Sequence, residues 1–434
     1  MKFYSTNNKQ LSVSFKEAVF NSLPSDKGLY MPLTVPKLNS EIIENIDTFS
    51  FQELALAVAK AFIENDIPED DLKKIVDDTL NFEAPVVKLD DGSYVLELFH
   101  GPSLAFKDFG ARFMSRIMAY FSQKNDVILD VLVATSGDTG GAVALGFDGV
   151  PNTRVTILYP KGKVSPVQEL QLCTNGGNIQ AIEIDGTFDD CQDLVKKAFN
   201  DANINKKLTL TSANSINISR LIPQSFYYFN AYRQLLQGGE KNVVFVVPSG
   251  NFGNLTAGLF AYKMGLPVKH FVAATNVNDV VPRFLGGEEY EPQPAVQTIS
   301  NAMDVGNPSN WSRVLDLFEG DIAELKKQIT AYSYTDDETR VAIEQIYQKD
   351  NYIACPHTAV AWSAAQRYRS EQPSDDAIVF LSTAHPCKFP DVFPDAIRNK
   401  IETPDAVKGL MNKGQNKVKL SNSYNDFKAF LMTY

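Results

Sequence analysis

Short apolar runs recur along the chain from about residue 94, and stretches with the spacing of amphipathic helices separate most of them. The runs lie at residues 94–99, 127–134, 153–159, 179–184, 243–248, 269–275 and 377–383. Strands that are this apolar and alternate with helices are typical of parallel sheets whose two faces are both covered. We therefore predict an α/β fold, in which ligands bind beyond the carboxyl ends of the strands.

The first 90 residues follow a different pattern. Two short strand-like segments and a turn-rich stretch come first, and helical spacing then appears at 51–63 and 69–80. We therefore predict a separate N-terminal α+β domain over residues 1–90. Further along, residues 284–313 are rich in glycine, proline and asparagine, which indicates an ordered but irregular insertion. The mixed charges of residues 319–350 predict solvated helix.

Composition and charge narrow the class of protein. The chain has 434 residues, of which 44% are hydrophobic, so it can bury a large core. Its formal net charge is −11 and it has no basic block, which disfavours nucleic acid and anionic membranes as partners. An acidic protein that binds an anion must build a local pocket rich in N–H groups or positive charge.

The four cysteines are widely spaced and form no CxxC motif, which is typical of reduced cytosolic thiols and offers no metal cluster. The N-terminus has no signal-peptide pattern, and no apolar run is long enough to span a membrane. We therefore expect a globular, cytoplasmic protein without a metal site.

Lys107 has the most informative position in the chain, because it lies between an apolar strand-like run and a stretch with helical spacing. Phe106 and Phe109 flank it, so we expect its amine to be poorly solvated, and desolvation favours the neutral form of lysine. A neutral amine is the form that makes a Schiff base with an aldehyde. Taken alone, an ordinary surface lysine with an apolar stem explains this position better.

The run that ends at Ala134 leads into a small-residue loop, TSGDTGG, and then into a predicted helix. Free N–H groups at a helix start, with the hydroxyls of Thr135, Ser136 and Thr139, form a candidate anion site. An ordinary tight turn with an aspartate N-cap explains the loop equally well.

The strand-like run at 243–248 leads into a second loop, SGNFGNLTAG. Gly250 and Gly253 allow the backbone to approach a ligand closely, and Asn251 and Asn254 offer amide donors. The loop is neither a GxGxxG motif nor a Walker loop, which disfavours nucleotide binding. It is the stronger candidate for holding a phosphate, with a structural glycine turn as the alternative.

Two further segments carry candidate chemistry. The segment SANSINISRLIPQ clusters Asn214, Ser215 and Arg220, and arginine suits two-pronged capture of a phosphate or carboxylate. The last apolar run ends in STAHPCKFP, which places Thr383 and His385 at the carboxyl end of a strand. A surface arginine and a packed histidine are the common alternatives.

Together these segments resemble the pyridoxal-phosphate enzymes of fold type II, the tryptophan synthase β type, and more narrowly the threonine synthase family. The matching segments include LELFHGPSLAFKDFGARFM, VLVATSGDTGGAVA, VVPSGNFGNLTAG and NAMDVGNPSNW, in the order of the family over residues 96–390. The resemblance implies two three-layer α/β units with mainly parallel sheets, in a catalytic region over 91–390. It also implies a C-terminal extension over 391–434 that packs on this region.

The resemblance also implies roles for individual residues. Lys107 would form the internal aldimine with pyridoxal phosphate and act as the acid and base. The expected cofactor-binding residues are Gly250, Asn251, Phe252, Gly253 and Asn254 for the phosphate, Thr383 for the pyridine nitrogen and Asp138 near the 3′-oxygen. The expected substrate-binding residues are Thr135, Ser136, Thr139, Asn214, Ser215 and Arg220. Asp138 departs from the asparagine that related enzymes often carry, and a carboxylate there would repel an ionised 3′-oxygen unless a proton is shared.

The activity implied by the resemblance is that of a carbon–oxygen lyase acting on phosphate. It would eliminate phosphate from the γ carbon of O-phospho-L-homoserine and add water at the β carbon to give L-threonine, as a monomer or homodimer. The alternatives are another fold-type-II lyase, such as a serine/threonine dehydratase or an amino-acid phospholyase, and a non-catalytic sensor of phosphorylated amino acids. The cluster at Asn214, Ser215 and Arg220 favours a phosphorylated substrate.

Overall fold

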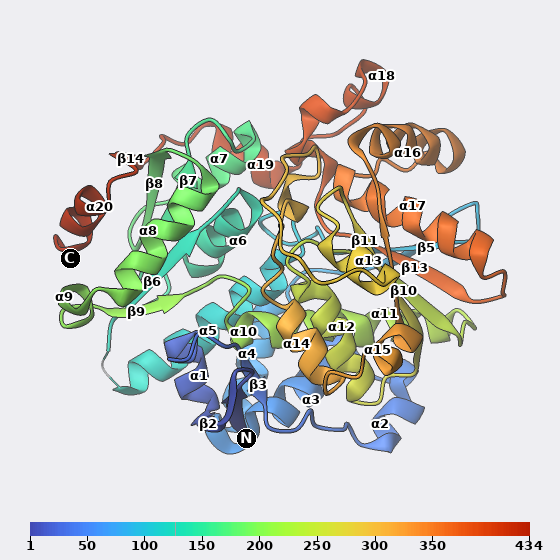
Figure 1. Cartoon of the computed structure of the whole chain (residues 1–434), viewed down its shortest axis with the longest axis horizontal. Helices are drawn as coiled ribbons and strands as arrows, with labels where there is room; N and C mark the ends of the chain where they lie inside the picture. The colour runs from blue at the N-terminus through green and yellow to red at the C-terminus, as the bar shows by residue number, and fades with distance from the viewer. Residues whose placement is uncertain (126) are drawn as a thin grey trace.

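The computed structural model describes residues 1–125 and 127–434, which form three sheets with helices around them (Figure 1). Two of the sheets are the cores of α/β units, and they lie on the left and right of Figure 1. The third is a small antiparallel sheet near the N-terminus. Mainly parallel sheets in two α/β units confirm the predicted fold class.

The larger sheet has six strands in the order β12-β11-β10-β13-β5-β4, and only the β4–β5 pair is antiparallel. Its strands are β4 (Val86–Lys88), β5 (Tyr94–Glu97), β10 (Val243–Pro248), β11 (Val268–Thr275), β12 (Ile329–Ser333) and β13 (Ala377–Ser382). Strands β10 and β13 are buried along their whole length, which explains their continuous apolar sequence.

The second sheet has five parallel strands in the order β14-β8-β7-β6-β9. Its strands are β6 (Leu129–Ala134), β7 (Thr153–Pro160), β8 (Ile179–Asp185), β9 (Thr209–Ser212) and β14 (Lys417–Ser421). Helix α8 (Phe188–Asn200) packs against β6 and β7, and α6 (Asp138–Phe147) also packs against β7. Strand β14 brings the C-terminal segment onto this unit, where it pairs with β8.

The N-terminal region contains the small sheet, in the order β2-β1-β3, and four helices. Its elements are β1 (Lys2–Ser5), β2 (Asn8–Ser14), β3 (Tyr30–Pro32), α1 (Phe15–Asn21), α2 (Ser40–Glu44), α3 (Phe51–Ile63) and α4 (Glu69–Thr79). The helices expected at 51–63 and 69–80 are therefore present. Ser50 begins α3 with a capping box to Glu53.

The remaining helices are α5 (Lys107–Asn125), α7 (Pro166–Cys173), α9 (Ala202–Asn205), α10 (Ile218–Leu221), α11 (Phe226–Gln237), α12 (Gly253–Lys263), α13 (Val280–Gly286), α14 (Trp311–Leu317), α15 (Ile322–Gln328), α16 (Asp336–Asp350), α17 (Pro356–Glu371), α18 (Asp395–Arg398), α19 (Asp405–Met411) and α20 (Tyr424–Leu431). The prediction of solvated helix over 319–350 is confirmed for α15 and α16 and was wrong for residues 329–333, which form β12. Residues 288–297 of the predicted insertion have no helix or strand.

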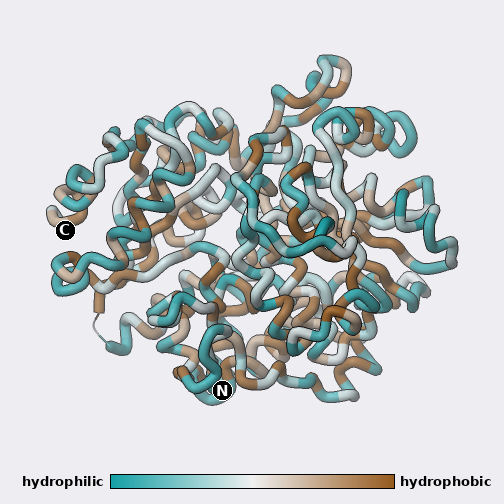
Figure 2. Tube along the Cα trace, viewed as in Figure 1, coloured by the Kyte–Doolittle hydropathy of each residue, from teal (hydrophilic) through white to brown (hydrophobic). Residues whose placement is uncertain are grey.

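The apolar strands lie inside the molecule and the polar segments lie around them (Figure 2). The four cysteines are all free, as their spacing predicts, and the structure buries all four. Within the described ranges, no helix has both the length and the apolar character needed to cross a bilayer.

Candidate active site

Lys107 is the first residue of α5, at the end of a loop that leaves β5. The loop is fixed to the end of β13, because the Phe106 N–H donates to the Thr383 carbonyl at 2.9 Å and the His385 N–H donates to the Leu104 carbonyl at 3.0 Å. The structure therefore brings Lys107 beside Thr383, although 276 positions separate them in the sequence.

The surroundings of Lys107 favour a neutral amine. Desolvation lowers its pKa to about 8, and the positive charges of Lys388 and Arg220 act in the same direction. Asp138 opposes them, since a nearby carboxylate raises the pKa of an amine. At pH 7, an amine with a pKa near 8 is neutral about a tenth of the time, against less than about one part in a thousand for an exposed lysine.

The loop of residues 135–141 lies at the carboxyl end of β6 and begins α6. The Thr135 hydroxyl accepts the N–H groups of Gly137 and Gly140 at 3.0 and 2.8 Å, so this side chain shapes the loop from within. Gly137 occupies the N-cap position with φ +135°, which requires glycine. Ser136 and Thr139 are partly exposed and are the hydroxyls of this loop available to a ligand.

The loop of residues 249–254 lies at the carboxyl end of β10 and begins α12. Phe252 has the left-handed φ of +59° and directly precedes the helix, which has no side-chain cap. The Asn254 carboxamide oxygen accepts the hydroxyls of Tyr227 and Tyr228, both at 2.7 Å. This orients the buried Asn254 amide nitrogen, which has no hydrogen-bond partner among the described residues.

The two glycines of this loop have different surroundings. A Cβ on Gly250 would lie 2.6 Å from the Met303 Cα, so glycine is required by packing against the 302–303 backbone. A Cβ on Gly253 would meet nothing closer than the Asn310 amide nitrogen at 3.4 Å. The sequence suggested that a ligand approaches the backbone closely at these glycines. At Gly250 the group that approaches closely is the backbone of residues 302–303.

The segment of residues 212–220 joins both loops. The Asn214 amide nitrogen donates to the Ala134 carbonyl at 3.0 Å, which holds the segment against the loop after β6. The Asn251 amide nitrogen donates to the Ser215 hydroxyl at 2.7 Å, which ties the segment to the loop after β10. Three predicted segments from distant parts of the chain thus meet at one place.

Arg220 is buried in α10, with only 2% of its surface exposed. One terminal nitrogen donates to the Ala213 carbonyl, and the Nε atom has no partner in the part of the chain that the structure describes. A Cβ on Gly110 would lie 2.8 Å from Nε, so α5 packs directly against the guanidinium. Among the described residues, no carboxylate forms an ion pair with Arg220, and burial lowers its pKa to about 10.

Sequence reasoning missed two buried cations. Lys388 lies within STAHPCKFP and is completely buried, with its ammonium 2.7 Å from Asp138. Arg313 lies in α14 and is also completely buried, and it donates to the backbone of Tyr30, Ser215 and Ile216. Their burial could not be predicted, because both occur in polar-looking segments of the sequence.

A cavity of about 380 Å³ lies beside the Lys107 loop. Its lining comprises Phe99, His100, Gly101, Pro102, Leu104, His385, Pro404 and Ala406. Burial lowers the pKa of His385 to about 4, so this ring is neutral at pH 7, and its Nδ1 accepts the Cys387 N–H at 3.2 Å. His100 lies 2.8 Å from Glu97.

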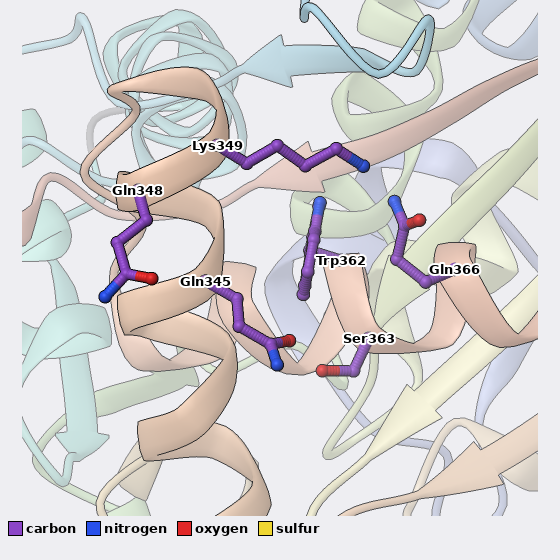
Figure 3. A pocket seen from close by; sticks show the side chains of 6 residues that line it. All are labelled: Gln345, Gln348, Lys349, Trp362, Ser363 and Gln366. Atoms are coloured by element: carbon purple, nitrogen blue, oxygen red, sulfur yellow. The ribbon is translucent and has the colours of Figure 1, made fainter.

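A second pocket, between α16 and α17, contains none of the predicted site residues (Figure 3). Its lining is polar apart from Trp362. Gln345 and Lys349 of α16 lie on the side toward Trp362, whereas Gln348 lies on the other side of α16 in this view. The predicted site residues instead lie on the loops around Lys107, at strand ends of both sheets.

Comparison with known proteins identifies the class. Residues 80–384 match the sequence model of the family described as pyridoxal-phosphate dependent enzyme. The chain belongs to this class of enzymes, and its cofactor is pyridoxal phosphate.

Its place within the class follows from both ends of the chain. Residues 2–80 match the model described as threonine synthase N terminus, and residues 358–431 match threonine synthase, C-terminal. The threonine synthase of Serratia marcescens is 45% identical over 94% of this chain and 93% of its own. The chain belongs to the threonine synthase family.

Solved structures agree with this assignment. The crystal structure of threonine synthase from Escherichia coli is 42% identical, with a TM-score of 0.91 and coverage of 100% of both chains. The structure of a threonine synthase with bound pyridoxal phosphate, from Brucella melitensis, is 35% identical with a TM-score of 0.92, and covers 100% of this chain and 99% of its own.

Proposed function

We propose that the chain converts O-phospho-L-homoserine and water to L-threonine and phosphate, with pyridoxal phosphate held at Lys107. The observation that carries this proposal is the hydrogen bond of 2.7 Å between Asn251 and Ser215. This bond joins the loop of residues 249–254 to the segment of residues 212–220, and both are suited to binding anions near the Lys107 amine, whose pKa is lowered. The reaction needs two such places, one for the cofactor phosphate and one for the substrate phosphate.

The residues present fit the cofactor. The start of α12 offers the free N–H groups of residues 252–254, and the unpartnered Asn254 amide nitrogen is a buried donor that lacks an acceptor. We assign the cofactor phosphate to Gly250, Asn251, Phe252, Gly253 and Asn254. We assign the Thr383 hydroxyl to the pyridine nitrogen, because its backbone already anchors the Lys107 loop.

The substrate phosphate is assigned to Ser136, Thr139, Asn214, Ser215 and Arg220. Arg220 supplies the positive charge, and its burial without a described carboxylate partner supports an anionic ligand. Thr135 is assigned mainly a structural role in the substrate site, because its hydroxyl oxygen already accepts the N–H groups of Gly137 and Gly140. It orders the loop around the phosphate, and its hydroxyl proton remains available.

Lys107 moves the protons of the reaction. When bound, pyridoxal phosphate supplies an aldehyde for the amino group of the substrate and a ring that stabilises negative charge on carbon. The neutral amine of Lys107 removes a proton from the α carbon and then from the β carbon. The bond from the γ carbon to the phosphate oxygen breaks and the γ carbon gains a proton. Water then adds its hydroxyl at the β carbon, and the α carbon regains a proton.

The setting of this reaction is also part of the proposal. We place it in the cytoplasm, which suits an acidic chain with four free cysteines. We expect the protein to act as a monomer or homodimer, because Lys107 and all the assigned ligands come from one chain.

A coupled assay tests the activity. Purified protein with O-phospho-L-homoserine should release phosphate and form L-threonine in equal amounts. Phosphate with 2-oxobutyrate and no threonine would show a phospholyase instead. Cofactor absorbance without turnover of any phosphorylated amino acid would favour a sensor.

A further inference from the structure

Lys388 and Asp138 form a buried ion pair between the two α/β units. Lys388 ends a short 3-10 helix after β13 of the six-stranded sheet, and Asp138 begins α6 after β6 of the five-stranded sheet. Their side chains are 0% and 4% exposed, and the ammonium lies 2.7 Å from the Asp138 carboxylate. The pair therefore crosses the boundary between the units where they contribute the candidate site.

Both members of the pair are held by further hydrogen bonds. The Lys388 ammonium also donates to the Ser103 carbonyl at 2.9 Å, and the Gln168 amide donates to Asp138 at 2.9 Å. The Gln171 amide donates to the same Ser103 carbonyl at 2.9 Å. Ser103 lies four positions before Lys107 in the loop that leaves β5, so Lys388 of the same unit and Gln171 of the other unit both hold this loop.

Removing two charges from water is costly, and apolar residues of similar volume often stabilise a protein at least as well. A buried pair is therefore weak evidence for stability alone. The position of the pair beside Lys107 indicates another role, because Asp138 raises the pKa of Lys107 and Lys388 lowers it.

We propose that Lys388 and Asp138 are positioning residues, which fix the Lys107 loop across the two units and balance each other's charge at the site. The balance allows a carboxylate to lie close to Lys107 and the bound cofactor without trapping the amine in its protonated form. This inference rests on the proposed function, because it takes Lys107 as the residue that binds pyridoxal phosphate.

The direction in which each substitution shifts the pKa of Lys107 follows from the charges around it. The charged groups that act on Lys107 are Asp138, which raises its pKa, and Lys388 and Arg220, which lower it. Replacing Asp138 by asparagine removes the negative charge that favours protonation and leaves the cations Lys388 and Arg220, so the pKa of Lys107 must fall. Replacing Lys388 as well removes one of those cations, so the pKa must recover.

Cofactor-free protein and pyridoxal phosphate alone are sufficient for the test. The association rate, followed by cofactor absorbance, rises with pH as Lys107 loses its proton, and its midpoint reports the pKa of that amine. We expect Asp138→Asn to lower this midpoint by about one pH unit. The double variant Asp138→Asn/Lys388→Met should return it toward the wild-type value, and Lys388→Arg should retain it.

Asp130→Asn is the matched control. It breaks another ion pair of the same sheet, at 2.7 Å from Arg154, and should leave the midpoint unchanged. An unchanged midpoint in Asp138→Asn, or a double variant no closer to wild type than the single one, would overturn the proposal. The double variant removes both charges of this pair, so neither of them is left buried without its partner, which guards against failure to fold. Because no substrate is used, failure of the threonine assay would not affect this result.

Discussion

Replacing Arg313 tests whether the substrate segment is held in place from outside the site. This guanidinium is completely buried and donates to the Tyr30 carbonyl at 3.0 Å, the Ile216 carbonyl at 2.7 Å and the Asn310 side chain at 2.8 Å. It also reaches the Ser215 carbonyl at 3.3 Å. One side chain thus joins the N-terminal sheet, the segment with Ser215 and the helix beside Asn251.

The expected size follows from these contacts. Lysine keeps the charge but has a single nitrogen, so Arg313→Lys should keep about two of the four acceptors. Each lost hydrogen bond costs about 1 kcal/mol, so the free energy of unfolding should fall by about 2 kcal/mol. Loosening the backbone at Ser215 should weaken a hydrogen bond to the substrate phosphate by about 1.4 kcal/mol, which is a tenfold rise in KM.

Three measurements decide the question. Urea unfolding gives the stability, steady-state kinetics give KM and kcat, and cofactor titration gives the affinity for pyridoxal phosphate. We expect a higher KM with cofactor affinity changed less than twofold. Arg283→Lys is the control, because Arg283 forms a partly exposed pair with Asp279 worth less than about 1 kcal/mol. A fall in stability with unchanged KM would refute the link to the substrate segment.

Three further substitutions test separate parts of the site and fold. Lys107→Ala should abolish both threonine formation and the cofactor absorbance band of the purified protein; a band that survives would place the cofactor elsewhere. Arg220→Ala should raise KM at least about tenfold, through loss of a charge-assisted hydrogen bond, and leave the cofactor spectrum intact; loss of the spectrum would make Arg220 structural. Lys417→Met removes the ion-pair partner of the buried Glu183. The free energy of unfolding, measured by urea titration, should therefore fall by about 3 kcal/mol. An unchanged value would mean that this ion pair does not hold β14 in place.

The sequence predicted what depends on local pattern. Lys107 at a helix start, the loops after β6 and β10, and most parallel strands follow from apolar runs and their ends. Strand β12 was missed because it lies at a sheet edge within a charged stretch, where three of its five residues are only partly buried. Strands β9 and β14 were not predicted either. They lie at the two edges of the five-stranded sheet, where part of each strand is exposed and the sequence is less apolar.

Contacts between distant segments could not be predicted in this way. The sequence offered Asn214, Ser215 and Asn251 as candidates, but the bonds to Ala134 and between Ser215 and Asn251 depend on how two sheets meet. The sequence also could not show how a carboxylate at Asp138 would be tolerated near the cofactor, because this too depends on a contact with a distant segment. Its partner, Lys388, lies 250 positions away, in a segment whose lysine could equally have faced solvent.

The buried cations are the groups with which a chain of net charge −11 would bind the two phosphates of the proposed reaction. The field of the whole molecule repels an anion at long range, and salt screens that repulsion over about 10 Å. Inside the site, Lys388 is cancelled by Asp138, whereas Arg220 and Arg313 form no ion pair with any described carboxylate. Their charge and the N–H groups at the start of α12 act at short range, where screening is weak. Selectivity for a phosphorylated substrate is therefore expected to come from buried donors rather than from the surface.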